Sequence, residues 1–178
     1  CCSWTDEYVS TLAVDLFRYM HYDGRYGEAL WEFGAGISYS NFSRKTHNYG
    51  VGEIASVPTS QLAVSPISFA VEIRNEAGPA GCYSALGFIS SEHPEAPRNR
   101  KLFDYASVNL AASASTIVTL NLTAATGSLI GADGTASIMP GTYTITVADV
   151  NFTLNLEGSA VIVAPAPPLF NRAAYADG

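Results

Sequence analysis

The sequence has 178 residues, with nine basic and sixteen acidic side chains, a formal net charge of −7 and a pI near 4.8. This length is typical of one domain that buries about two-thirds of its unfolded surface, and the acidic balance disfavours nucleic acid and anionic membranes as partners. No apolar run approaches the ~20 residues of a membrane span and no signal peptide is recognisable, so we expect a soluble, already processed chain.

Residues 1–49 are rich in aromatic side chains and lack a clean amphipathic period, which predicts an extended arm and linker. Within this arm, residues 30–42 (LWEFGAGISYSNF) place aromatic side chains around Gly34 and Gly36. Glycine permits backbone turns that a side chain would obstruct. We interpret the segment as an aromatic clamp on a turning chain; the alternative is core aromatics beside a turn.

Residues 50–164 alternate short β-branched runs with turn residues, a pattern typical of antiparallel strands. The clearest run places four apolar side chains on one face: Ile67, Phe69, Val71 and Ile73. It ends at Asn75, and residues 75–81 are predicted to form a hairpin or sheet-crossing turn. Further strands are predicted at residues 53–57, 82–89, 102–110, 116–122, 142–147 and 152–163. About seven strands in roughly 110 residues predict an all-β, immunoglobulin-like or fibronectin type III-like β-sandwich.

Two polar segments interrupt or follow these strands. Residues 90–101 (SSEHPEAPRNRK) mix charges of both signs, so we expect a solvated loop in which His93 has no special role. Residues 165–178 form a proline-containing tail, in which an extended polyproline conformation is expected.

The cysteines and sequons indicate the compartment. Cys1, Cys2 and Cys82 form no metal-binding pattern, but Cys82 is a candidate to pair with either of the other two in an oxidising compartment. The alternative is a buried free thiol. Three N-x-[ST] sequons begin at Asn41, Asn121 and Asn151. Together they predict a secreted, extracellular protein that carries N-linked glycans.

The sequence offers no convincing catalytic constellation. A glycosidase needs two carboxyl groups about 5–9.5 Å apart across a sugar pocket. The closest acidic pairs in the sequence lie on the predicted arm, where no scaffold holds them in a cleft: Asp6 with Glu7, and Glu28 with Glu32. The histidines stand apart from one another: His21, His47 and His93. With no nucleophile motif and no metal set, we predict no catalytic residue, no metal and no cofactor.

Several of these segments resemble one protein family. Residues 30–42 resemble the G-x-G-[LI]-S-Y-[ST]-x-F signature that joins the second and third domains of glycoside hydrolase family 3 enzymes. Residues 4–9 (WTDEYV) are similar to the W-x-x-x-Y-V of its β-xylosidase-like branch, and residues 24–36 resemble the arm that leads into the third domain. Three later matches follow in the family's order: Asn75 with Ala80-Gly81, Leu102-Phe103-Asp104-Tyr105, and Pro140-Gly141-x-Tyr143.

The resemblance implies a C-terminal fibronectin type III-like domain with its leading arm. Two departures are visible, because the turn glycine after Asn75 is displaced to Gly78 and the glycine expected after Leu110 is replaced by Ala-Ser repeats. In this family the aspartate nucleophile and the general acid both precede the region that this chain resembles. The resemblance therefore implies a module that is not itself an enzyme.

Three functions follow from these observations. The main prediction is a structural subunit that self-assembles into oligomers or filaments, because an arm with many aromatic side chains needs a partner. Its predicted contacts are Trp4, Tyr8, Phe17, Tyr19, Trp31 and Phe33. The first alternative is a C-terminal accessory domain of a family 3 exo-glycosidase, whose partner is the catalytic part of the parent enzyme. The second alternative is a carbohydrate-binding module.

Overall fold

The computed structural model describes residues 35–48, 54–97 and 100–165. Its elements in chain order are β1 (Asn41–Thr46), β2 (Ile54–Pro58), α3 (Thr59–Val64), β3 (Ile67–Ala77), β4 (Gly81–Ser91), β5 (Lys101–Leu110), β6 (Ser115–Leu122), α4 (Ala124–Gly127), β7 (Leu129–Ile130), β8 (Ala136–Ile138), β9 (Gly141–Val147), β10 (Val150–Glu157) and β11 (Val161–Ala164). Within this described part the strands form three sheets, ordered β1-β3-β6, β2-β10-β9-β4-β5 and β11-β8-β7. The predicted all-β sandwich is confirmed.

The core lies between the first two sheets, which contribute aromatic rings from opposite sides. Phe69 on β3 is fully buried, and its ring centroid lies 5.4 Å from that of Phe152 on β10 and 6.3 Å from that of Phe103 on β5. A Cβ added at Gly87 on β4 would lie 2.8 Å from side-chain atoms of Phe103 and Leu120. The two sheets therefore pack closely around a centre built from Phe69.

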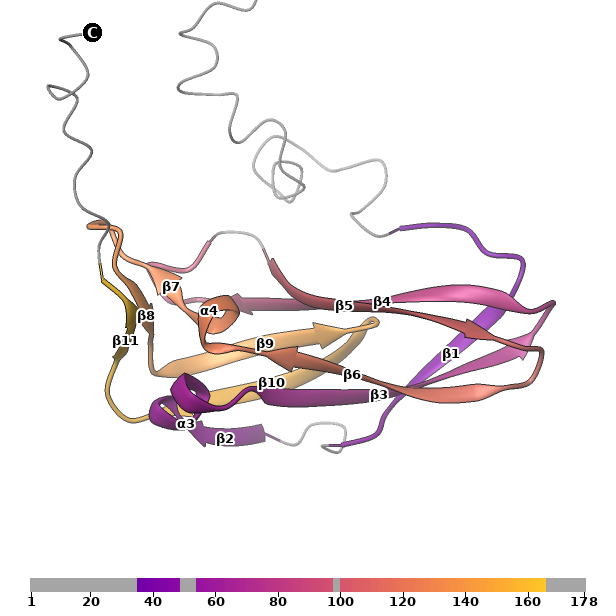
Figure 1. Ribbon diagram of the computed structural model, residues 1–178, viewed down its shortest axis with the longest axis horizontal. Helices are drawn as coiled ribbons and strands as arrows, with labels where there is room; N and C mark the ends of the chain where they lie inside the picture. The colour runs from indigo at the N-terminus through magenta and orange to yellow at the C-terminus, as the bar shows by residue number, and fades with distance from the viewer. Residues whose placement is uncertain (1–34, 49–53, 98–99, 166–178) are drawn as a thin grey trace, which may run out of the picture.

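The predicted alternation along β3 is confirmed, since Ile67, Phe69, Val71 and Ile73 are all buried. The turn after β3 leads to β4, which belongs to the other sheet, so residues 75–81 form a sheet-crossing turn. Figure 1 shows the long strands side by side along the longest axis, with α3, α4, β7, β8 and β11 at the left end and β1 crossing near the right end.

Several elements differ from the sequence predictions. Strand β1 lies inside the segment assigned to the arm and pairs antiparallel with β3. The strand predicted at residues 152–163 is divided at Gly158, whose φ of +104° turns the chain, so that β10 and β11 belong to different sheets. Helices α3 and α4 and strands β7 and β8, each six residues or shorter, were not predicted.

Tyr143 on β9 anchors the end of the sandwich that holds the small sheet. Its side chain is almost fully buried, and its hydroxyl donates a hydrogen bond of 2.9 Å to the carbonyl oxygen of Met139, four residues upstream. Burial raises the pKa of the Tyr143 phenol above its ordinary value. A buried tyrosine bonded to nearby upstream backbone resembles the tyrosine corner of immunoglobulin-like sandwiches.

Among the residues that the structure describes, no helix is long and apolar enough to cross a membrane.

Candidate functional site

A polar groove lies at the end of the sandwich where the chain enters it. The groove has a volume of about 650 Å³ and is bordered by the linker before β1, the outer face of β4 and the turn between β9 and β10. Its floor comes from alternate residues of β4, Ser84, Leu86 and Phe88. The guanidinium of Arg100 lies 4.4 Å from the centroid of the Phe88 ring. The floor therefore combines apolar side chains with a cation.

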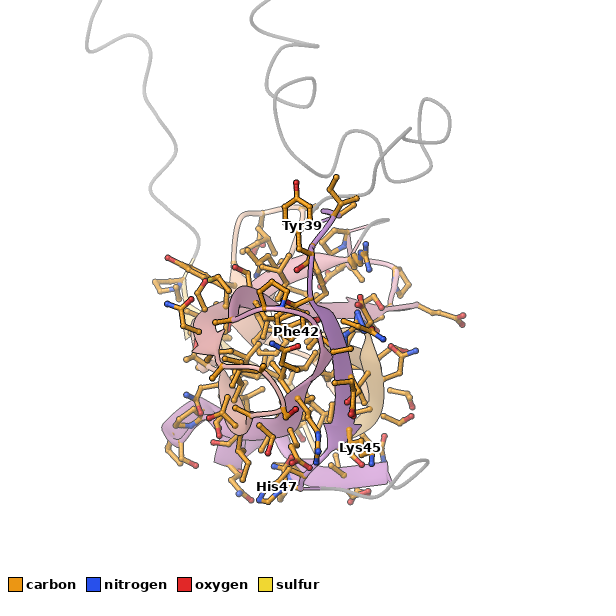
Figure 2. All side chains as sticks on the ribbon, turned by 90° about the vertical axis from the view of Figure 1, so that its right-hand side faces the viewer. Tyr39, Phe42, Lys45 and His47 are labelled. Carbon is orange, nitrogen blue, oxygen red and sulfur yellow. The ribbon has the colours of Figure 1, made fainter. Side chains whose placement is uncertain are left out.

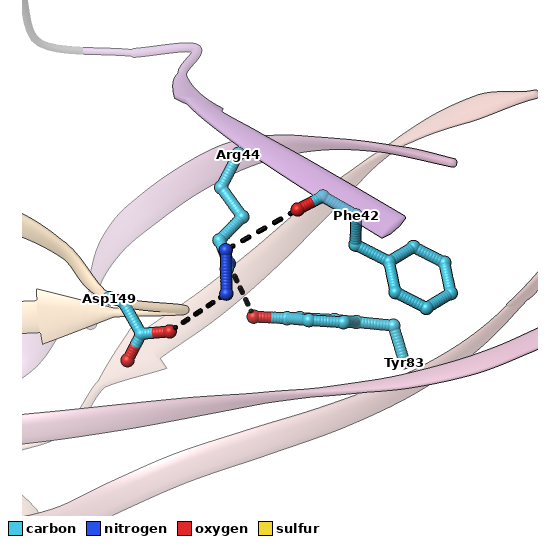
Figure 3. A network of polar contacts seen from close by, with 4 residues as sticks. All are labelled: Phe42, Arg44, Tyr83 and Asp149. Atoms are coloured by element: carbon cyan, nitrogen blue, oxygen red, sulfur yellow. Dashed lines mark hydrogen bonds and ion pairs between the residues drawn. The ribbon is translucent and has the colours of Figure 1, made fainter. Parts of the chain in front are cut away.

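Arg44 on β1 ties together three segments at this groove (Figure 3). Its Nε–H donates to the Tyr83 hydroxyl oxygen on β4 at 2.9 Å, and its Nη2 lies 3.1 Å from Asp149 Oδ2. Nη1 donates a longer bond of 3.4 Å to the carbonyl oxygen of Phe42. The hydrogen bond to Tyr83 is the main cause that raises the pKa of Arg44, and the charge of Asp149 adds to it.

Two aromatic rings, tilted by 58° to each other, pack beside Arg44 and help to fix its position. The Arg44 guanidinium carbon lies 5.5 Å from the Tyr83 ring centroid, which lies 5.2 Å from that of Phe42. Phe42 is buried and belongs to the hydrophobic core of the sandwich. Cation–π contacts of this kind favour arginine over lysine, because the planar guanidinium both stacks and donates hydrogen bonds.

A two-residue turn presents Asp149 to Arg44. Ala148 and Asp149 connect β9 to β10 with φ values of 49° and 65°, as expected for a type I′ hairpin. The Ala148 N–H donates to the carbonyl oxygen of Leu86 at 3.0 Å, which fixes the turn against β4. The carboxylate is 75% exposed, so its ion pair with Arg44 is largely solvated.

The linker before β1 is held by the turn between β3 and β4. The buried Ser40 donates from its hydroxyl to the carbonyl oxygen of Pro79 at 2.7 Å. Gly78 has a φ of +108°, and a Cβ added there would lie 2.6 Å from the carbonyl oxygen of Tyr39 and 2.8 Å from the Ser40 Cα. The displaced glycine of this turn therefore lets the linker pack directly against backbone.

The side chain of Asn75 stabilises the same turn from within the core. It is fully buried, and its Nδ2 donates to the carbonyl oxygens of Pro79 at 2.8 Å and Leu110 at 3.5 Å. Its Oδ1 has no hydrogen-bond partner among the described residues. The two N–H groups of this amide therefore link the end of β3 to the following turn and to the end of β5.

The described part of the glycine-rich segment, residues 35–42, differs from the predicted clamp. A Cβ added at Gly36 meets nothing within 4 Å, and its φ is not positive, so a side chain would fit there. Ile37 and Tyr39 are 97% and 98% exposed and do not clamp the described chain. Phe42 alone among the described aromatics of this segment enters the core. Gly34 and the earlier aromatic residues of the segment lie outside the described residues.

The other predicted site residues fall in three groups. Cys82 is an exposed free thiol at the groove, whereas Cys1 and Cys2 lie outside the described residues, so their pairing stays a prediction. Asn41 lies at the groove, and Asn121 and Asn151 are exposed on strands. The predicted assembly contacts and the acidic pairs lie outside the described residues: Trp4, Tyr8, Phe17, Tyr19, Trp31, Phe33, Asp6, Glu7, Glu28 and Glu32.

The chemistry of the groove is that of a binding or contact surface. Asp149 is the single carboxylate among the described residues that line it, and Arg44 holds that group in an ion pair. The remaining polar side chains of the described lining are hydroxyls, the Asn41 amide, the Cys82 thiol and the Arg100 guanidinium. In the described part of the chain, no group of three or more histidine, cysteine or acidic residues is arranged to hold a metal.

Sequence reasoning missed Arg44, Tyr83 and Asp149. The Ala148-Asp149 pair contains neither the glycine nor the asparagine that usually marks a type I′ hairpin, so the sequence does not reveal this turn. No local signal shows that this turn faces Arg44, since Asp149 connects two strands of the five-stranded sheet while Arg44 lies in the three-stranded sheet, far away in the sequence.

The sequence matches no known protein-family profile and no curated protein. Its fold is nevertheless shared with parts of several solved glycosidases. A GH3 exo-β-xylosidase, XlnD, solved with a xylobiose aziridine probe, matches 84% of this chain with 21% of its own, at 18% identity and a TM-score of 0.72. A β-glucosidase from Listeria innocua, solved with gluconolactone, matches 89% of this chain with 21% of its own, at 21% identity and a TM-score of 0.64.

A third similar structure is a β-glucosidase from Kluyveromyces marxianus in complex with glucose, which matches 81% of this chain with 17% of its own, at 19% identity and a TM-score of 0.64. This chain thus spans about a fifth of the length of these enzymes. The TM-scores demonstrate a shared fold, which is the fold implied by the sequence resemblance, and at these identities the likeness extends to the fold alone.

Proposed function

We propose that this chain is a non-catalytic accessory domain of a larger exo-glycosidase of the glycoside hydrolase family 3 type. The observation that carries this proposal is the fold match, in which most of the chain corresponds to about a fifth of an exo-β-xylosidase and of β-glucosidases. The family's catalytic carboxylates belong to domains that precede the region resembled by this chain. Its partner is therefore the catalytic part of the same polypeptide.

The linker geometry supports this role. Ser40, Gly78 and Arg44 fix the chain as it enters the sandwich, so a preceding domain would be joined at a defined position. Ile37 and Tyr39 project from this linker with almost all of their surface exposed, and Figure 2 shows Tyr39 beyond the body of the sandwich. Large apolar side chains exposed in this way mark contact surfaces.

The comparisons support the accessory role rather than the self-assembling subunit that the sequence favoured. They bear on neither filament formation nor sugar binding by the chain itself. The proposed role of the domain is to stabilise its neighbours and border their substrate entrance.

The coding sequence upstream of Cys1 tests this proposal. We expect an open reading frame that continues into a barrel domain with a family 3 aspartate motif. A secretion signal directly upstream of Cys1, with no barrel, would contradict it and favour an independent secreted subunit.

A further inference from the structure

Two of the three sequons lie on opposite outer faces of the sandwich. Asn121 is on β6 of the three-stranded sheet, between the buried Leu120 and Leu122. Asn151 is on β10 of the five-stranded sheet, and the next residue, Phe152, points into the core. Because side chains alternate along a strand, both asparagines project away from the core toward solvent.

A hydrogen bond from the neighbouring strand holds the side-chain oxygen of each asparagine. The Ser68 hydroxyl on β3 donates to Asn121 Oδ1 at 2.8 Å, and the Thr146 hydroxyl on β9 donates to Asn151 Oδ1 at 2.8 Å. In both cases the donor is the direct cross-strand partner of the asparagine. Since the amide group is planar, fixing Oδ1 against the neighbouring strand turns Nδ2 away from that strand.

Asn121 is fixed by its backbone as well. Its N–H donates to Asp104 Oδ2 on β5 at 2.8 Å, and Asp104 Oδ1 accepts a bond of 2.8 Å from the N–H of Tyr105. Asp104 therefore links the edge of one sheet to the edge of the other at the position of Asn121. The asparagine is held from two sides while its Nδ2 remains on the exposed surface.

The surroundings of Asn151 suit a carbohydrate. The outer faces of β9 and β10 present hydroxyl and amide side chains around it, among them Thr144, Thr146 and Thr153. Hydroxyls and amides exchange hydrogen bonds with sugar hydroxyls as readily as with water. The polar side chains of β9 and β10 therefore surround the asparagine with groups that can bind a sugar.

We propose that Asn121 and Asn151 carry N-linked glycans, and that Ser68 and Thr146 orient them in the folded protein. In the transfer, the asparagine Nδ2 attacks the anomeric carbon of a lipid-diphosphate-linked oligosaccharide. A carbon–nitrogen bond forms, the bond from the anomeric carbon to the diphosphate oxygen breaks, and the amide proton leaves with the lipid diphosphate. The product retains Oδ1 as an acceptor, so the bonds from Ser68 and Thr146 persist. This modification does not depend on the proposed function.

Site occupancy is measured on the full chain secreted from a eukaryotic host. Treatment with peptide N-glycosidase F in ¹⁸O water converts each glycosylated asparagine to labelled aspartate, which peptide mass spectrometry locates. We expect labels at residues 121 and 151, and the loss of one glycan mass in each of Asn121→Gln and Asn151→Gln.

A control variant tests whether the host modifies an exposed sequon in this chain. The substitution Asp133→Asn creates an Asn-Gly-Thr sequon in an exposed turn. A label at residue 133 with Asn121 and Asn151 unmodified would overturn the proposal.

The orienting hydroxyls are tested separately by Ser68→Ala and Thr146→Val, which leave the sequons intact. We expect unchanged occupancy but about fivefold faster glycan release by peptide N-glycosidase F from the folded protein, the ratio that corresponds to one hydrogen bond of about 1 kcal/mol. Thr144→Val, on the same face of β9, is the matched control and should leave the rate unchanged. Equal release rates in all variants would refute the orienting role.

Discussion

Gly78 gives a direct test of how the linker is seated on the sandwich. The substitution Gly78→Ala places a Cβ 2.6 Å from the Tyr39 carbonyl oxygen and 2.8 Å from the Ser40 Cα. Both are backbone atoms, so no side-chain rotation relieves the contact. The residue also retains a φ of +108°, at which alanine is strained by about 1–3 kcal/mol.

The expected cost combines this strain with a lost contact. If the linker moves away, the hydrogen bond from Ser40 to Pro79 is lost, which is worth about 1 kcal/mol. We therefore expect Gly78→Ala to lower the free energy of unfolding by about 2–4 kcal/mol. Urea unfolding followed by circular dichroism measures this change, and amide hydrogen exchange at Ser40 reports release of the linker.

Gly36→Ala is the matched control in the same linker. Its added Cβ meets nothing within 4 Å and its φ is not positive, so we expect no loss of stability. The reasoning is refuted if Gly78→Ala unfolds within about 0.5 kcal/mol of the unsubstituted chain and leaves the exchange of the Ser40 amide unchanged.

Three further substitutions probe the core, the groove and an acidic turn. Phe69→Ala should cost about 3–5 kcal/mol in urea unfolding, because it empties the centre of the core; a loss below about 1 kcal/mol would contradict this packing. Asp149→Asn keeps a residue suited to positive φ but removes the ion pair with Arg44, so we expect a loss below about 1 kcal/mol that disappears in 1 M salt; a loss independent of salt would contradict an ionic contribution. Hydrogen bonds from Thr135 lower the pKa of Asp133 in the folded protein. The ionised carboxylate therefore contributes stability at pH values above its unfolded-state pKa, and this contribution is lost as the pH falls through its folded-state pKa. Thr135→Val should raise the pKa of Asp133 in an NMR titration, and an unchanged value would refute that cause.

Strand patterns were predictable where one face is consistently apolar. The period-two alternation of Ile67, Phe69, Val71 and Ile73 is sufficient to identify β3 and the face that it buries. Strand β1 escaped prediction because Phe42 is its single large apolar residue, and its pairing with β3 is a tertiary contact. Strand β2 pairs in parallel with β10, a partner about 100 residues later that local patterns do not reveal.

The candidate site was even less predictable from local sequence patterns than the strand pairing. Each of Arg44, Tyr83 and Asp149 is an ordinary residue in its local sequence, and the groove exists because three separate segments meet. The resemblance of the turn after Asn75 to a family motif pointed to the correct region. The physical reason for its displaced glycine, close contact with the linker backbone, required the structure.

The size of the native polypeptide tests the accessory-domain account most directly. Native material is deglycosylated with peptide N-glycosidase F and separated by denaturing electrophoresis, and an antibody raised against this chain locates the polypeptide. A second, untreated sample is separated by size-exclusion chromatography, and its fractions are assayed for the antigen and for β-glucosidase and β-xylosidase activities. The account predicts one polypeptide several times larger than 18.8 kDa that co-elutes with glycosidase activity. An antigen of 18.8 kDa that separates from both activities would contradict it.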